Sequence, residues 1–398
     1  MSAATVIADD AEALAVAAEL AADFRKDAAE RDARRRLPHP ELQRLSASGL
    51  LGVTVPAEFR GADVRTETLA GIFQLLASAD ASLAQIPQSH FVYVNVLRRQ
   101  GTREQREFFF GEVLAGKRFG NAQSEAGTSR VQDICTRLRR RPDGSYVLDG
   151  VKHYSTGALF ADWIPVLARA DDDKLHVAYV RRDAPGVTVV DDWDGMGQRT
   201  TASGTVRLES VPVPADRVVP HHLTFEGPQL HGAVAQLLHA AIDAGIASGA
   251  LAEAVEFVRT KSRPWFESVG EGHATAAEDP LLIQRFGELA IRVRAADALL
   301  ATAAGSVDAA RADLTDDSAA EASIAVAAAK VTAAEAAVEV GSALFEVAGT
   351  RAALDSLGLH RHWRDARTHT LHDPARWKVQ HIGRYVLRGI RPPRHGLL

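Results

Sequence analysis

The pattern of apolar residues changes twice along the 398 residues of this chain, and this order constrains the fold more than any single motif. From residue 11 to about residue 117, alanine and leucine recur at spacings of three and four, as on one face of a helix. Between about residues 119 and 220 the apolar residues form short, β-rich runs. Long helical patterns return from about residue 227. The order predicts an α+β protein with a β domain between two helical domains.

The length of the chain also favours several domains, because single cores stop growing beyond about 250–300 residues. We therefore expect an N-terminal helical domain at 1–118 with four to six helices, and a middle β-barrel-like domain at 119–225. A C-terminal helical bundle at 226–398 completes the prediction.

Several elements can be assigned within this outline. The sequence Arg-Pro-Asp-Gly-Ser at 141–145 predicts a hairpin turn, because Asp-Gly pairs favour tight turns. The alanine-rich run 319–348 predicts a helix, and the polar residues 315–318 resemble its N-terminal cap. Strands are expected at 146–148, 163–167, 176–180 and 186–190.

Composition excludes some classes of protein. Lys and Arg total 46 against 51 Asp and Glu, and the net charge of −5 predicts neither a nucleic-acid nor a membrane partner. The single cysteine, Cys135, excludes a disulfide framework within the chain, and we expect it to be a small buried residue. The stretch Met1–Asp10 lacks the basic and apolar regions of a signal peptide, which predicts a cytoplasmic protein.

The eleven residues Arg364–Pro374 form an unusually dense polar run. His369 and His372 are three residues apart, so they share a face if the segment is helical. Pro374 disfavours helical geometry in the residue before it. The pattern predicts two side chains that exchange protons near neutral pH at the end of a helix.

The order of domains resembles the acyl-CoA dehydrogenase family, and four motifs strengthen the resemblance. Ser124–Gly127 is similar to the flavin-contacting Thr-Glu turn of that family, and Lys152–Gly157 to its Lys-x-Trp-Ile-Thr strand. Met196–Arg199 is similar to its Met-Gly-x-Arg motif, and Arg364–Ala366 to its Arg-Asp-Ala motif. The resemblance implies the acyl-CoA dehydrogenase-like fold: an N-terminal helical domain, a middle β domain and a C-terminal bundle.

One departure from the family concerns its catalytic glutamate, which lies in a Tyr-Glu-Gly-Thr turn after Arg-Asp-Ala. This chain has His372-Asp373-Pro374 there. A dehydrogenase with Asp373 as its base is one alternative, but a displacement of about an ångström in a catalytic group can cost about 100-fold in rate.

A more specific resemblance is to the reduced-flavin monooxygenases of the dibenzothiophene-desulfurisation and sulfur-acquisition type. It implies a two-component enzyme that uses reduced FMN and O2, through a C4a-hydroperoxyflavin, to oxygenate a small sulfone, sulfoxide or sulfinate. It also implies a homotetramer and a separate NAD(P)H-dependent flavin reductase. FAD is the alternative cofactor, and an N-hydroxylating flavin monooxygenase is the alternative activity. The resemblance rests on Gln88–Phe91, Gly120–Ala126, Tyr154–Phe160, Gln198–Gly204, Arg367–Pro374 and Pro392–Gly396.

The same resemblance implies the catalytic residues. His372 is the expected proton donor, because an imidazole can both give and accept a proton near working pH. His369 is expected to support His372 or to line the same pocket. His90 and Ser155 complete the predicted catalytic set.

The residues expected to bind the flavin come from two segments of the middle domain and one helix end. Their polar side chains and backbone groups match the donors and acceptors of a flavin ring. Arg263 is expected to bind the phosphate, because a guanidinium can grip phosphate with two hydrogen bonds. The predicted set is Asn121, Ser124, Tyr154, Ser155, Thr156 and Arg263.

Metal binding is an alternative outside flavin chemistry. His360, His362, His369 and His372 have spacings at which imidazoles can converge on zinc or iron. The chain has no HExxH motif and no cysteine cluster, so we predict that it holds no metal.

Overall fold

The computed structural model describes residues 4–398. The first three residues, part of the stretch in which we expected no signal peptide, lie outside the described residues. The strands are β1 (Arg137–Arg140), β2 (Tyr146–Lys152), β3 (Trp163–Arg169), β4 (Leu175–Arg181), β5 (Val187–Val190), β6 (Thr205–Val213) and β7 (Val218–Val219). The α-helices are α1 (Asp10–Arg25), α2 (Ala28–Arg34), α3 (His39–Ala47), α4 (Thr66–Ala79), α5 (Ala81–Gln85), α6 (Gln88–Gln100), α7 (Arg103–Leu114), α8 (His231–Thr260), α9 (Phe266–Gly270), α10 (Pro280–Ala312), α11 (Asp316–Ala348), α12 (Arg361–His369) and α13 (Ala375–Arg388).

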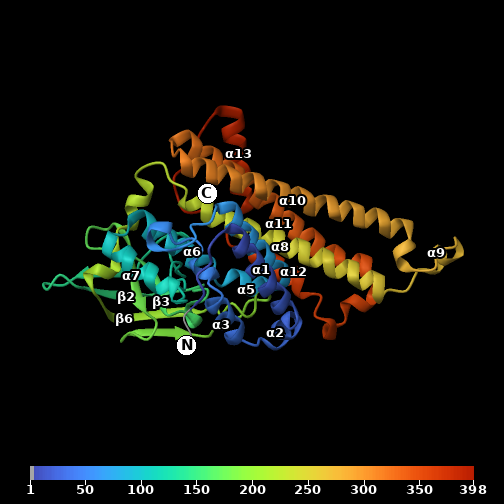
Figure 1. Cartoon of the computed structure of the whole chain (residues 1–398), viewed down its shortest axis with the longest axis horizontal. Coiled ribbons are helices and arrows are strands. Elements are labelled where there is room, and N and C mark those ends of the chain that lie inside the picture. The colour runs from blue at the N-terminus through green and yellow to red at the C-terminus, as the bar shows by residue number, and fades with distance from the viewer. Residues whose placement is uncertain (1–3) are drawn as a thin grey trace.

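Helices, then strands, then helices follow one another along the described chain, as predicted (Figure 1). From residue 4 to the start of the sheet, the structure contains seven α-helices instead of the expected four to six. The extra elements are short: α2 has seven residues and α5 only five. Helices of one or two turns carry too few residues to show a clear period.

The middle part is one seven-stranded sheet with the order β5-β6-β2-β1-β3-β4-β7. All four predicted strands are present, and the 141–145 turn joins β1 to β2 as an antiparallel hairpin. Strands β1, β6 and β7 were not among the strand ranges assigned from the sequence, although the predicted turn implied a strand before it. Strand β1 reads Arg-Leu-Arg-Arg and is largely exposed, so it has little apolar signal. Strands β5 and β7 lie at the two edges of this mixed sheet, which forms the middle β domain of the predicted fold.

The C-terminal part is built on three long helices, α8, α10 and α11, which run side by side (Figure 1). The predicted capping residues of α11 form a capping box between Thr315 and Ser318. Among the described residues, α8 alone is long and apolar enough to cross a membrane, but 83% of its most apolar window is buried inside the protein. Its apolar character therefore reflects a central place in the core.

Cys135 is exposed, so the prediction that it is buried was wrong. It lies just before β1 in a segment where exposed and buried residues alternate. Its backbone N–H donates to the Glu125 carboxylate (2.8 Å), which fixes the main chain while the side chain faces outward.

The Arg-Asp-Ala motif fixes α12 against the other two parts of the chain. Arg364 pairs with the Asp32 carboxylate and donates to the Met196 carbonyl (2.6 Å). Asp365 accepts a hydrogen bond from the Gln198 backbone N–H (2.6 Å). A Cβ atom at Gly197 would lie 2.1 Å from the Arg364 carbonyl oxygen, so only glycine allows this approach.

These contacts determine where the end of α12 lies. Burial and the nearby charge of Asp32 raise the pKa of Asp365 to about 7. The Arg-Asp-Ala motif therefore forms a buried hydrogen-bond network that connects α12 to the other two parts of the chain. This network holds the histidines that follow the motif in a fixed position.

Candidate active site

The predicted histidine pair lies at the end of α12, although the two residues do not share a helical face. His369 is the last residue of α12, and His372 lies in the turn that follows. The His372 Nδ1 atom lies 2.8 Å from the His369 carbonyl oxygen, and the two ring centroids are 4.9 Å apart. The turn, and not a shared helical face, therefore brings the rings together.

A buried carboxylate holds His369 from the opposite side. The Nδ1 atom of His369 lies 2.6 Å from Oδ1 of Asp243 in α8. Lys330 of α11 donates to Oδ2 of the same carboxylate (2.5 Å). All three side chains are at most 2% exposed.

The neighbouring groups determine the charge states of Asp243 and His369. Burial would raise the pKa of Asp243, but the charges and hydrogen bonds of Lys330 and His369 lower it to about 2. Asp243 is therefore a carboxylate near neutral pH. Burial lowers the pKa of His369, and Asp243 opposes this effect.

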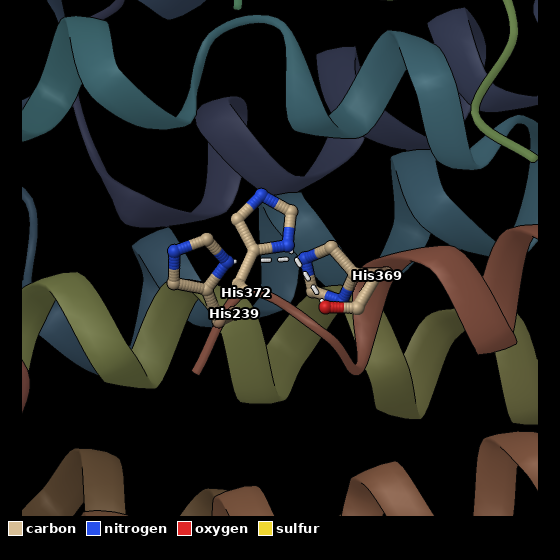
Figure 2. A group of neighbouring side chains, drawn as sticks. All are labelled: His239, His369 and His372. Carbon is tan, nitrogen blue, oxygen red and sulfur yellow. Dashed lines mark hydrogen bonds between the residues drawn. The ribbon is translucent and has the colours of Figure 1, made fainter. Parts of the chain in front are cut away.

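A third ring, that of His239 in α8, completes the cluster (Figure 2). Its Nδ1 atom lies 3.0 Å from Nε2 of His369, and its centroid lies 4.7 Å from that of His372. His239 and His369 are buried, whereas His372 is exposed. Although the residue as a whole is exposed, the His372 ring packs against its two neighbours, and this loss of water together with His369 lowers its pKa to about 4. Burial lowers the pKa of His239. His372 is the member that a bound molecule can reach.

The four histidines that were considered as an alternative metal site do not come together. His360 lies between Asp355 (3.0 Å) and Arg364 (2.9 Å), and His362 lies 3.2 Å from Glu253. The His239, His369 and His372 cluster does place its nitrogens within 4.8 Å of one another. These nitrogens already have hydrogen-bond partners in the protein, and the absence of a resident metal stays a prediction.

Gln85 lies between the two C-terminal histidines. Its Oε1 atom is 3.1 Å from Nε2 of His369, and its Nε2 atom is 3.2 Å from Nε2 of His372. It is the last residue of α5, whose N-terminus is capped by Asp80. Asp80 also binds Arg31 (3.0 Å), which fixes the short helix and places Gln85 in the cluster.

Sequence reasoning missed four members of this cluster: Gln85, His239, Asp243 and Lys330. His239 and Asp243 are four residues apart in an otherwise apolar stretch, so they share a helical face. Lys330 is the one Lys or Arg between residues 316 and 348. Buried charges need partners, so both signals could have indicated a buried polar site. Gln85 carried no comparable signal.

His90 is hydrogen-bonded to other parts of the described chain and not to this cluster. Its Nδ1 atom accepts a hydrogen bond from the Phe119 backbone N–H (3.0 Å), and its Nε2 atom therefore donates to the Leu51 carbonyl (3.0 Å). It is 1% exposed, and burial lowers its pKa to about 4. Both nitrogens of a neutral ring are thus occupied by backbone groups.

The predicted flavin residues of the middle part form one continuous edge. The backbone N–H of Asn121 donates to the Thr156 carbonyl (3.1 Å), and its side-chain amide reaches the Tyr154 carbonyl (3.4 Å). Tyr154 has a φ of 55°, a conformation that bulky residues rarely adopt, and it is exposed. After this turn, Ser155 and Thr156 are buried.

Ser155 is unusual because its buried hydroxyl has no hydrogen-bond partner within the described chain. Thr156, in contrast, bonds to the Ser203 hydroxyl (2.7 Å). A buried polar group without a partner costs free energy, so Ser155 is suited to meet a bound molecule. Ser124 lies on the same edge, where its carbonyl accepts a bond from the His153 backbone N–H (2.9 Å).

A buried ion pair and a close contact position this edge. Lys152 of β2 donates to Glu125 (2.7 Å), which fixes the segment next to Ser124. A Cβ atom at Gly157 would lie 3.1 Å from the carbonyl oxygen of Ile86, the residue after Gln85. The edge that carries Ser155 is therefore adjacent to the element that carries Gln85.

Two other residues named from the sequence, Arg263 and Asp373, belong neither to the histidine cluster nor to the flavin edge. Arg263 is exposed in the short segment between α8 and α9, and Figure 1 shows α9 at the end of the bundle away from the sheet. The 22 residues from His239 to Thr260 alone span about 30 Å of helix. Asp373, the alternative base, is buried and binds Lys378 of α13 (3.1 Å).

Three family models match this chain. The acyl-CoA dehydrogenase N-terminal domain matches residues 9–117, the middle domain matches 120–211 and the C-terminal domain matches 237–377. These matches cover well over half of the chain.

Individual relatives match along nearly the whole length. Dibenzothiophene monooxygenase of Rhodococcus erythropolis is 34% identical over 405 residues, which covers 97% of this chain and 95% of that protein. The probable FMNH2-dependent monooxygenase SfnC of Pseudomonas putida is 33% identical and covers 96% of each chain. The FMN-bound structure of TdsC from Paenibacillus sp. A11-2 has a TM-score of 0.91 at 32% identity and covers 97% of this chain and 100% of that one. The chain therefore belongs to the acyl-CoA dehydrogenase family, in the branch that includes the dibenzothiophene monooxygenases.

Proposed function

We propose that the chain is the oxygenase of a two-component flavin-dependent monooxygenase that oxygenates a small organosulfur compound. The substrate class is a sulfone, sulfoxide or sulfinate. The named activities of the relatives, dibenzothiophene oxygenation and FMNH2-dependent oxygenation, support this function, and FMN in the TdsC structure supports the cofactor. A separate NAD(P)H-dependent flavin reductase is proposed to supply reduced FMN. A cytoplasmic location is part of the same proposal, and fractionation of cells tests it.

The observation that carries this proposal is the unpartnered Ser155 hydroxyl on an edge adjacent to the histidine cluster. Reduced FMN, when bound, supplies the two electrons that activate O2. The Ser155 hydroxyl and the Asn121 amide offer hydrogen bonds to the flavin ring, and the backbone at Ser124 and Tyr154 offers further groups. The buried surroundings of Ser155 and Thr156 keep water away from the reacting atoms.

His372 has a defined task in this reaction. One oxygen atom of O2 is added to the sulfur compound, and the other leaves as water, so the departing oxygen must receive a proton. His372 is the exposed end of a buried group that contains a carboxylate and two further imidazoles. Its Nε2 atom is the position from which it holds and delivers that proton.

Stopped-flow absorption of the purified protein tests the proposal. Mixed with reduced FMN and O2, the protein should give a transient absorbance band that neither reduced nor oxidised FMN shows. Addition of the substrate should shorten the lifetime of this band, and mass spectrometry should detect a product that contains one atom of ¹⁸O from ¹⁸O2. Flavin oxidation at the rate of free solution would contradict the proposal. A matched panel of sulfinates, sulfoxides, sulfones and amines distinguishes sulfur from nitrogen oxygenation.

We also propose a homotetramer in which Arg263 binds the flavin phosphate of a neighbouring subunit. Arg263 follows the end of α8, which is about 30 Å along that helix from His239, so it is too distant to serve the site of its own chain. Exposed apolar residues on α10 and α13 support an interface, because a chain alone rarely leaves such faces in water. They are Leu281, Ile283, Ile291, Val386 and Leu387.

Two variants distinguish action in trans from action within one chain. Arg263→Ala should weaken FMN binding about tenfold or more, because a charged hydrogen bond contributes about 1.5–3 kcal/mol. Arg259→Ala, one turn earlier and also exposed, is the matched control. Coexpression of Arg263→Ala chains with His372→Ala chains should restore activity, since mixed tetramers contain intact composite sites. Inactive mixtures, or a monomer by light scattering, would contradict the proposal.

A further inference from the structure

We propose that Gln85 is a positioning residue for proton delivery, because its amide links His369 to His372 and determines which ring carries a second proton. The inference deepens the proposed function and rests on it, since a proton on His372 matters only where oxygen is activated. Gln85 belongs to none of the motifs by which the family was identified.

The Nδ1 atoms of both rings have defined protonation states. Nδ1 of His369 faces the Asp243 carboxylate (2.6 Å), and Nδ1 of His372 faces the His369 carbonyl oxygen (2.8 Å). Carboxylate and carbonyl oxygens only accept hydrogen bonds, so both Nδ1 atoms carry hydrogen. The second proton of each ring can therefore reside only on Nε2.

Both Nε2 atoms face the same amide, at 3.1 Å for His369 and 3.2 Å for His372. A side-chain amide accepts at its oxygen and donates at its nitrogen. With the oxygen toward His369, that ring must carry a proton on Nε2, while His372 must offer a lone pair. Rotation of the amide by half a turn reverses both requirements. When both bonds are formed, the two rings hold one extra proton between them, and the amide orientation determines its position.

The surrounding charges are compatible with both orientations. On α8, Asp243 and His239 face the pair, with Nδ1 of His239 3.0 Å from Nε2 of His369. Nδ1 of His239 can accept a hydrogen bond when Nε2 of His369 is protonated, and it can donate one when Nε2 of His369 is not. The charged side chains that complete the surroundings are Lys330 of α11, which binds Asp243, and Lys378 of α13, which binds Asp373.

The two positions of the proton differ in access. On His369 the proton is buried beside Asp243, and on His372 it is exposed to a bound molecule. Amide rotation would thus carry the site from a state that stores the proton to a state that delivers it.

Nuclear magnetic resonance of the flavin-free full chain tests the relay. The protein is labelled with ¹⁵N at histidine and treated with a chelator, and the ring nitrogens are followed against pH. In the parent protein, one proton should be shared between Nε2 of His369 and Nε2 of His372, so the resonances of both nitrogens should change with the same apparent midpoint pH. Rings that titrate at unrelated midpoints would overturn the proposal.

Variants of Gln85 separate the relay from a purely structural role. Gln85→Met removes the amide and should give the rings separate midpoints, with that of His372 lowered. Gln85→Glu accepts at both ends and should raise both midpoints by about one pH unit or more, a tenfold change in proton affinity. Equal shifts in both variants, or none, would overturn the relay.

Gln88→Met is the matched control, because Gln88 is also buried and donates only to the Ala235 carbonyl (3.2 Å). It should leave the shared midpoint unchanged, and thermal unfolding confirms that each variant is folded. The titration needs no flavin, so its outcome is independent of the oxygenation assay. A shared midpoint in a protein that oxygenates nothing would leave the relay intact and refute only the proposed function.

Discussion

Replacement of His372 by alanine is expected to lower product formation by about 100-fold or more, the lower end of what general acids contribute. Among the three clustered rings only His372 is exposed, so no other imidazole of the cluster can replace it. Oxidation of reduced FMN should continue, because the flavin edge at Ser155 and Asn121 is untouched. The oxygen that no longer reaches the substrate should appear as hydrogen peroxide.

The measurement is the ratio of product to FMNH2 consumed, with peroxide quantified in parallel. His176→Ala is a suitable control, because this histidine lies on β4 and bonds only to the Lys174 carbonyl. It should leave the ratio unchanged. Fully coupled oxygenation by His372→Ala would show that the proton comes from another group.

Replacement of Lys330 by methionine is expected to cost about 3–5 kcal/mol of unfolding free energy, the typical loss when a buried charge loses its partner. Asp243 would keep only His369 as a cationic neighbour in its buried position. The ionised Asp243 has a lowered pKa, so its stabilising contribution is present above the ordinary value of 3.8 and is lost as pH falls toward about 2. The loss should therefore be larger at about pH 7 than at about pH 3.

Urea unfolding of the parent and the variant at both pH values measures this loss. The double variant Lys330→Met with Asp243→Asn removes both charges, and it should recover much of the stability that the single variant loses. A loss below about 1 kcal/mol in the single variant would mean that the pair contributes no more than an exposed salt bridge.

Much of the fold could be predicted from local patterns. The 141–145 turn and the capping residues before α11 were confirmed, because turn and cap signals lie within a few neighbouring residues. The exposed β1 and the five-residue α5 were missed, because neither is long or apolar enough to show a period. The exposed side chain of Cys135 was not predicted, because exposure depends on how the segment packs and not on residue type alone.

The candidate site could also be predicted only in part from the sequence. Sequence motifs indicated the His369 and His372 pair and the edge from Asn121 to Thr156, and the structure brings the members of each set together. His90 and Arg263 were chosen by resemblance, and the structure places His90 between two backbone groups and Arg263 in the segment after α8. Their proposed roles stay predictions.

By itself, the sequence determined the order of the helical and β parts, the family, and the histidine pair after Arg-Asp-Ala. Each of these depends on patterns or motifs of residues that are close together in the sequence. The tertiary structure alone decided which groups surround that pair. His369 meets Asp243 across 126 residues and Gln85 across 284, and Lys330 meets Asp243 across 87. No local period links positions so far apart. Their protonation depends on burial and paired charge, which exist only when α5, α8, α11 and α12 pack together.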